Sequence, residues 1–195
     1  MPTNETALQD SAQEIATALL QNSVGGGGRG PRRRARFHAL AVDEVRRLTP
    51  DSIEVSFAVP AALRGEYDYL PGQYVALRAT VDGQELRRSY SLCRPPSGDS
   101  LSIAIKQDLG GRFSSWAQTN LHPGDVIDVM SPQGTFTSTL ADYDGAHIAA
   151  VAAGSGITPV MALASTVLAR SETSRFTLVY TWLLYTSAAD GHLPW

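Results

Sequence analysis

The sequence predicts a fold of two parts, in which a set of antiparallel strands is followed by one strand–helix–strand unit. Between residues 37 and 129, six short segments alternate apolar and polar residues, with turn residues between them. This spacing is typical of an antiparallel barrel or sandwich. After residue 145 two apolar runs flank a helical segment, which is the order of a parallel βαβ unit. The 195 residues, 43% of them hydrophobic, suffice for one or two domains with a real core.

The six antiparallel strands are recognised by their period-two alternation and by the turns between them. They are expected at residues 37–42, 53–57, 71–77, 86–92, 101–105 and 126–129. Asp82-Gly83 predicts a tight hairpin turn between the third and fourth strands, and Pro123-Gly124-Asp125 predicts another turn before the sixth. A short helix is expected at residues 112–121, directly after Gly110-Gly111.

The parallel unit is predicted from two apolar runs. Residues 147–153 and 176–180 are apolar almost throughout, which predicts parallel strands that are buried on both faces. Between them, Pro159 suits the first turn of a helix, where its missing N–H group costs nothing. Apolar residues then recur at helical spacing from Val160 to Leu168.

Four parts are expected along the chain. They are a flexible N-terminal extension and linker (1–36), the barrel domain (37–142), an incomplete α/β domain (143–181) and a foreign or disordered tail (182–195). The α/β part holds only two strands, whereas a doubly wound sheet usually has about five or six. Residues 1–22 carry a weak helical pattern. The Gly-rich linker ends in Arg32 to Arg34, which is either a solvated tail or a contact for nucleic acid or a membrane.

The composition excludes several classes of protein. A net charge of −3 argues against a general polyanion binder, so no nucleic-acid partner is expected. Cys93 is the sole cysteine, so neither a disulfide nor a four-thiolate metal site can form within the chain, as suits a reducing compartment. The four histidines show no ligand spacing. There is no apolar run of about 18 residues and no secretory signal pattern. We therefore expect a cytoplasmic protein without membrane contact.

Three stretches carry residues suited to chemistry, and the first runs from Arg88 to Ser91. Arg88 offers a planar fork of donors that suits a phosphate, Tyr90 offers a ring face for stacking, and Ser91 offers a hydroxyl that donates and accepts. A strict strand separates Ser91 from the other two, so a ligand has to lie along the strand edge or end. The alternative is a barrel strand with a solvated arginine and a packed tyrosine. No base partner or nucleophile elbow accompanies Ser91, which argues against a hydrolase.

The second stretch is Gly110-Gly111, with Ser114 and Ser115 shortly after it. Two glycines before a helix expose backbone N–H groups, and the start of a helix favours an anion. The serine hydroxyls add further donors. The alternative is an ordinary loop with a helix cap.

The third stretch runs from Gly154 to Pro159. It follows an apolar strand and opens a helix, which is the context that a dinucleotide-binding turn requires. Gly154 and Gly156 let a pyrophosphate approach the backbone, and Thr158 places a hydroxyl near a bound ring. The sequence therefore favours a nucleotide at this turn.

Taken together, these stretches resemble the ferredoxin–NADP reductase superfamily from about residue 37 to residue 180. The stretches that carry the resemblance are, in order, Pro71-Gly72-Gln73-Tyr74, Arg88-Ser89-Tyr90-Ser91, Ile103-Ala104-Ile105-Lys106, Gly110-Gly111-Arg112-Phe113-Ser114, Pro123-Gly124-Asp125, Pro132-Gln133-Gly134-Thr135-Phe136 and Gly154-Ser155-Gly156-Ile157-Thr158-Pro159. Within the superfamily, residues 87–93, 105–106 and 110–117 make the chain most similar to the reductase subunits of phenylacetyl-CoA epoxygenases, whose close relatives serve other multicomponent oxygenases.

The resemblance implies a Greek-key barrel that binds FAD, followed by a pyridine-nucleotide domain. In the family pattern, Arg88 holds the FAD phosphates, Tyr90 packs on the isoalloxazine ring or ribityl chain, and Ser91 lies near flavin N5. Tyr90 and Ser91 are therefore the expected catalytic residues. The other cofactor contacts implied are Gly110, Gly111 and Ser114 at the pyrophosphate, Lys106 in a strand that lines the flavin, and Gly154, Gly156, Thr158 and Pro159 at the NAD(P)H site.

The implied activity is transfer of hydride from NADPH or NADH to FAD, with electrons passed through an iron–sulfur centre to an oxygenase. The chain departs from the family pattern in three ways. Thr181-Trp182-Leu183 replaces the turn that helps select the adenosine ribose, a late Cys-Gly motif is missing, and this chain lacks the four cysteines of a plant-type [2Fe–2S] domain. We therefore expect weak or no turnover from residues 1–195 alone. The alternatives are a non-catalytic β-barrel binding module and an inactive fragment.

Overall fold

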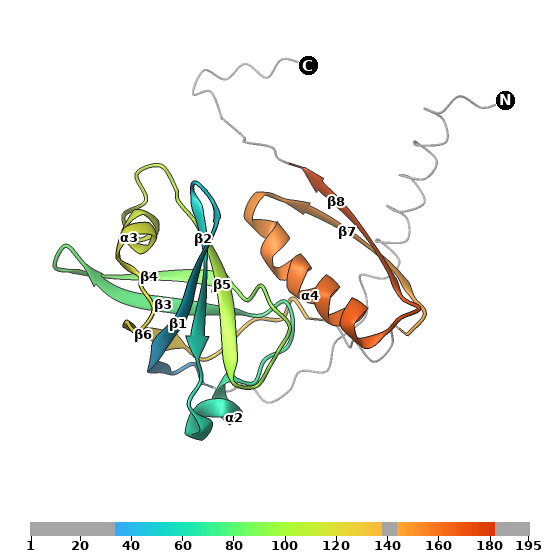
Figure 1. Cartoon of the computed structure of the whole chain (residues 1–195), viewed down its shortest axis with the longest axis horizontal. Helices are drawn as coiled ribbons and strands as arrows, with labels where there is room; N and C mark the ends of the chain where they lie inside the picture. Colours follow the sequence, from blue (N-terminus) through green and yellow to red (C-terminus); the bar gives the residue numbers. More distant parts are fainter. Residues whose placement is uncertain (1–33, 138–143, 182–195) are drawn as a thin grey trace, which may run out of the picture. The chain divides into compact units, whose positions relative to one another are not determined.

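The computed structural model describes residues 34–137 and 144–181 and contains two sheets (Figure 1). One sheet has six antiparallel strands and the other has two parallel strands. This confirms the predicted fold class, in which an antiparallel barrel is followed by a parallel α/β part. The helix expected in residues 1–22, residues 23–33 of the linker after it and the tail from residue 182 lie outside the described residues.

The antiparallel sheet curls into a half-barrel (Figure 1). Its strands are β1 (Phe37–Thr49), β2 (Ser52–Ala58), β3 (Tyr74–Val81), β4 (Gln84–Ser91), β5 (Ser100–Lys106) and β6 (Val126–Met130). They lie in the order β4-β3-β6-β1-β2-β5, so that β6 returns to lie between β1 and β3, as in Greek-key topology. The edge strands β4 and β5 meet at an isolated bridge between Leu92 and Ile103.

All six predicted antiparallel strands are present, and β1 is longer than the sequence indicated. It continues to Thr49 because its second half pairs with β2 beyond an irregularity at Val42 and Glu44. The predicted hairpin turn at Asp82-Gly83 is confirmed. Both residues have positive φ angles, 49° and 75°, and the flanking strands pair directly across the turn, as in a type I′ hairpin.

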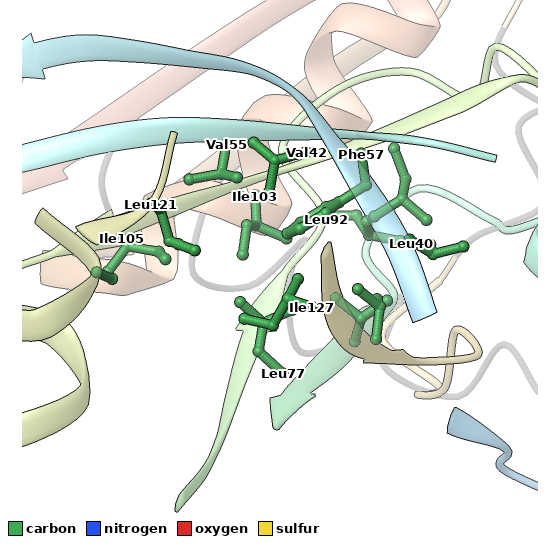
Figure 2. Packing of buried hydrophobic residues seen from close by; sticks show 14 of the residues in the cluster. Leu40, Val42, Val55, Phe57, Leu77, Leu92, Ile103, Ile105, Leu121 and Ile127 are labelled. Atoms are coloured by element: carbon green, nitrogen blue, oxygen red, sulfur yellow. The ribbon is translucent and has the colours of Figure 1, made fainter. Parts of the chain in front are cut away.

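The inward faces of these strands form one hydrophobic core (Figure 2). Alternate residues of each strand point inward because side chains in a strand repeat with period two. Its fully buried members include Leu40, Val55, Phe57, Val75, Leu77, Leu92, Ile103, Ile105 and Val129. The predicted helix is α3 (Arg112–Asn120), which adds Phe113 and Ala117 to the core.

Two short elements were not predicted from the sequence. They are the 3-10 helix η1 (Ala61–Leu63) and the α-helix α2 (Arg64–Tyr67). Tyr67 is buried, and its hydroxyl donates a hydrogen bond of 2.6 Å to the Val129 carbonyl. This bond ties the connection between β2 and β3 to β6.

The parallel unit has the predicted order of strand, helix and strand. It consists of β7 (His147–Ala153), the 3-10 helix η3 (Gly154–Gly156), α4 (Ile157–Arg170) and β8 (Arg175–Thr181). The prediction that both strands are buried on both faces is wrong. Only Ala152 is buried in the two strands, and the paired residues Val151 and Val179 are 58% and 51% exposed. The reason is that α4 is the one described helix packed on this two-stranded sheet, so the other face is uncovered among the described residues.

We expect the substitution Gly72→Ala to destabilise the half-barrel by about 3 kcal/mol or more. Gly72 has a φ of +94°, and an added Cβ atom would lie 1.8 Å from the Phe136 carbonyl oxygen. The substitution therefore adds steric overlap to the ~1–2 kcal/mol cost of a left-handed backbone. Urea unfolding measures the loss.

Gly98→Ala is the matched control, because Gly98 has a φ of +85° but open space at its Cβ position. It should cost only about 1–2 kcal/mol. Equal losses in the two variants would contradict the role of the Phe136 contact.

Candidate functional site

Arg88 and Tyr90 lie in β4, which is an edge strand of the half-barrel. They are two residues apart and therefore share one face of the strand. On that face Leu86 and Tyr90 pack against the core, whereas Arg88 is exposed. The strand thus holds a guanidinium and a phenol ring side by side at the open edge of the sheet.

The Arg88 guanidinium has a different kind of partner from the guanidinium groups of the nearby arginines Arg87 and Arg94. Arg87 pairs with Glu85, and Arg94 pairs with Glu54. Arg88 donates a hydrogen bond of 2.7 Å to the Arg87 carbonyl oxygen and makes no ion pair within the part of the chain that the structure describes. Its positive charge is therefore not compensated by a carboxylate there.

The Tyr90 ring packs against the first turn of α3. Its centroid lies 6.1 Å from that of Phe113. Burial raises the pKa of Tyr90 to about 12, the Asp108 carboxylate acts in the same direction, and the Arg88 guanidinium opposes both. The phenol therefore keeps its proton at neutral pH and stays a hydrogen-bond donor. The contact with Phe113 brings the first two predicted stretches together.

The start of α3 is shaped by glycine and serine. The Gly111 N–H donates to the Asp108 carbonyl (2.9 Å). The Ser114 hydroxyl accepts from the Asp108 N–H (3.0 Å) and donates to the Gly111 carbonyl (3.2 Å). A Cβ atom on Gly111 would lie 2.5 Å from the Ser114 hydroxyl oxygen, and the preceding Gly110 has a φ of +74°. The turn therefore requires its glycines.

This turn also has the electrostatics of an anion site. The first N–H groups of an α-helix have no partner within the helix and carry a partial positive charge. The first turn of α3 contains no acidic residue. Arg88 and the helix start thus offer two groups that favour an anion on this side of the half-barrel, and the Asp108 carboxylate beside Tyr90 opposes them.

The remaining two predicted residues of the half-barrel have different surroundings. Ser91 is half-buried opposite Tyr74 of β3, and its hydroxyl makes no hydrogen bond among the described residues. Lys106 ends β5, and its ammonium lies 3.5 Å from the Asp51 carboxylate, in the turn between β1 and β2. This ion pair was not predicted from the sequence.

The predicted stretch from Gly154 to Pro159 lies between β7 and α4, in the predicted context of strand, turn and helix. Gly154 has a φ of +51°, and its carbonyl accepts a hydrogen bond of 3.3 Å from the Tyr180 hydroxyl. Gly156 precedes the first residue of α4, and Thr158 and Pro159 lie half-buried in its first turn. The start of α4 also lacks acidic residues.

Sequence reasoning missed a buried ionic cluster on the outer face of β2. Its centre is Glu54, which is 6% exposed and accepts hydrogen bonds from Arg46 and Arg94. Burial alone would raise the pKa of Glu54, but the two guanidinium groups outweigh it and hold that pKa below its usual range. The Cys93 thiol lies 3.9 Å from the Glu54 carboxylate. No local signal reveals this cluster, because Arg94 is forty residues from its partner.

A groove of about 800 Å³ lies beside β3, α3 and β6, with lining residues that include Arg78, Glu85, Trp116 and Asp128. None of the predicted site residues lines it. No helix in the described ranges has the length and apolar character needed to cross a bilayer. The same ranges contain no group of three His, Cys, Asp or Glu residues that fits a metal ion.

Comparisons with known proteins show the family of this chain. Residues 39–138 match the oxidoreductase FAD-binding domain family. The chain is 43% identical over 145 residues to a subunit of the 1,2-phenylacetyl-CoA epoxidase from Escherichia coli K12, covering 74% of this chain and 40% of that protein. It is 34% identical over 148 residues to the ferredoxin reductase component of 3-ketosteroid-9-alpha-monooxygenase from Rhodococcus rhodochrous, covering 75% and 41%. The chain thus spans about two fifths of the length of these relatives.

Solved structures show a similar fold. The cytochrome P450 reductase of Amycolatopsis superposes with a TM-score of 0.65 at 27% identity, covering 81% of this chain and 46% of that one. Phthalate dioxygenase reductase, described as a modular structure for electron transfer from pyridine nucleotides to [2Fe–2S], gives a TM-score of 0.57 at 26% identity, covering 74% and 43%.

We expect the Cys93 thiol to be almost inert in the folded chain. Burial, reinforced by the charge of Glu54, raises the pKa of Cys93 to about 12. At pH 8 only about one thiol in ten thousand is then ionised, against about one in four for an ordinary thiol. Alkylation by iodoacetamide at pH 8 should therefore be more than about 100-fold slower in the native protein than in urea. Similar rates in the two states would contradict this assignment.

Proposed function

The chain belongs to the oxidoreductase FAD-binding domain family, within the ferredoxin–NADP reductase superfamily, and we propose that it binds FAD along β4 and the start of α3. In this proposal it is the reductase that passes electrons from NADPH or NADH through FAD to an iron–sulfur centre and the oxygenase component of a multicomponent system. The phenylacetyl-CoA epoxygenase type is the system favoured by the 43% identity to an epoxidase component. The proposed boundaries are 37–142 for the FAD domain and 143–181 for the nucleotide domain.

The observation that carries the proposal is the cradle formed by β4 and α3. The uncompensated guanidinium of Arg88 and the N–H groups at the start of α3 are the donors that a pyrophosphate requires. The Gly111 backbone packs against Ser114 and Asp108, so this turn has no room for a side chain at that position. Gly110 and Ser114 hold the turn in this form. The residues present therefore fit FAD.

The protein groups at the ring end of this ligand bind and orient it. Tyr90 supplies a neutral phenol ring, already held against Phe113, on which a flat heteroaromatic ring stacks. Ser91 supplies a hydroxyl that donates a hydrogen bond at the ring edge. When bound, FAD supplies the redox chemistry, since it accepts two electrons and releases them singly. In this proposal Lys106 stabilises the strand that lines the flavin through its ion pair with Asp51.

The nicotinamide nucleotide is assigned to the turn before α4. Gly154 and Gly156 leave the backbone accessible at a helix start without acidic residues, where a phosphate is favoured. Thr158 and Pro159 in the first turn of α4 complete the proposed NAD(P)H site. A cytoplasmic location fits this supply of reduced nucleotide.

Colour is the direct test of the proposed function. Purified chain that has taken up added FAD should show flavin absorbance bands at roughly 370 and 450 nm, which come from the cofactor itself. A protein that stays colourless after incubation with FAD would favour a non-catalytic β-barrel binding module. In the same preparation, oxidation of NADPH and NADH measures the weak or absent turnover expected of residues 1–195.

We expect Arg88→Ala to weaken FAD binding by about tenfold or more, because a charge-assisted pair with a phosphate is lost. Arg87→Ala is the matched control, since Arg87 is the adjacent residue and pairs with Glu85. Its FAD affinity should stay within about twofold of the unsubstituted chain. Titration of apoprotein with FAD, followed by quenching of flavin fluorescence, measures both. Equal losses in the two variants would refute the assignment of Arg88.

A further inference from the structure

The chain changes partner strand immediately after the proposed flavin contacts. Up to Ser91, β4 pairs with β3. The Leu92 N–H donates to the Gln73 carbonyl (2.9 Å), and the Cys93 N–H donates to the Ser102 carbonyl in β5 (3.0 Å). The segment after Tyr90 and Ser91 therefore crosses from one edge of the half-barrel to the other, and beyond Cys93 it leaves the ladder of strands.

A side-chain contact fixes this crossing segment from the outer face of β2. Arg94 forms a two-pronged interaction with Glu54, in which Nε donates to Oε1 and Nη2 donates to Oε2 at 2.8 Å. Glu54 is buried, and Arg46 of β1 holds the same carboxylate from the opposite strand. A planar pair of this kind fixes the orientation of the arginine as well as its position.

A second contact holds the backbone of the same segment. The Tyr69 hydroxyl donates to the carbonyl oxygens of Arg94 (3.0 Å) and Pro95 (3.1 Å). Tyr69 is 5% exposed, so its ring cannot swing away without disturbing the core. Two contacts thus anchor the chain just after the crossing. Glu54 binds the Arg94 side chain, and Tyr69 binds the backbone carbonyls of Arg94 and Pro95.

We propose that Glu54 and Tyr69 are positioning residues for the proposed flavin site, acting through Arg94 on Tyr90 and Ser91. This inference rests on the proposed function. The end of β4 has one neighbouring strand on one side and the ligand on the other, so its placement depends on where the chain is anchored after Ser91. Neither Glu54 nor Tyr69 is assigned to touch FAD.

Two pairs of variants separate positioning from general stability. Arg94→Lys and Arg46→Lys each weaken one ion pair of Glu54, but only Arg94 belongs to the crossing segment. Tyr69→Phe and Tyr67→Phe each remove a buried hydroxyl that donates to a carbonyl, but the partner of Tyr67 is Val129 in β6. Each variant keeps its charge or its ring, so the fold is retained. Urea unfolding measures the stability lost in each pair.

The FAD-loaded chain supplies the deciding measurements. Arg94→Lys and Tyr69→Phe should weaken FAD binding by about threefold to tenfold and should shift the flavin midpoint potential and absorbance maxima. Arg46→Lys and Tyr67→Phe should leave all three as in the unsubstituted chain.

Two results would contradict these proposals. In the first, both members of each pair change the FAD affinity, midpoint potential and absorbance maxima in proportion to the stability that they lose. Glu54 and Tyr69 then have only a structural role, and the inference is overturned. Failure of the unsubstituted chain to bind FAD would overturn the proposed function, and the positioning role with it. The two failures are distinguishable, because the first appears only in the variants and the second already in the parent.

Discussion

The half-barrel depends on its closure at Leu92. This side chain is fully buried, and its backbone forms the isolated bridge to Ile103 that joins the two edge strands. Neither β4 nor β5 has a second neighbouring strand in the described sheet, so the core beneath them is closed by this bridge and by α3, which contributes Phe113 and Ala117. An edge strand normally leaves a row of backbone groups unpaired. Here the same edge carries the residues of the proposed flavin site, so closure of the fold and placement of the site use one segment of chain.

The arginines of the half-barrel illustrate two uses of the same side chain. Arg46 and Arg94 surround a buried carboxylate, whose charge they offset within the folded chain. Arg88 has no such partner among the described residues and bonds to a main-chain carbonyl. A guanidinium that is paired with a carboxylate stabilises the fold. A guanidinium without such a pair, beside the start of a helix, is available to bind an external anion. Sequence position alone does not separate the two cases, since Arg87 and Arg88 are adjacent.

The elements predicted well from sequence are those whose two faces differ in environment. Alternation revealed the strands of the half-barrel because one face meets the core and the other meets water or polar groups. Glu54 obeys this alternation, and a charged residue at an outward position of a strand is usually solvated. Its burial follows from Arg94 and Cys93, which fold over that face from a distant part of the chain.

Other differences also have physical causes. η1 and α2 comprise only three and four residues, too few to show a helical period, so Tyr67 and its bond to Val129 were missed. The apolar runs of β7 and β8 predicted two-sided burial, yet a strand is buried on both faces only when layers cover both. The glycine turns before α3 and α4 were recognised because helix starts after glycines have a local signature. The ion pair of Lys106 with Asp51 has no local signature in the sequence.

The state of Cys93 has a practical consequence for spectroscopy of this protein. It is the sole thiol of the chain, and its burial beside Glu54 keeps it protonated. A cysteine introduced at an exposed site would therefore react with a maleimide dye or a nitroxide while Cys93 itself stays unmodified. A low reactivity of Cys93 would therefore allow distances between labelled positions to be measured without first replacing this residue.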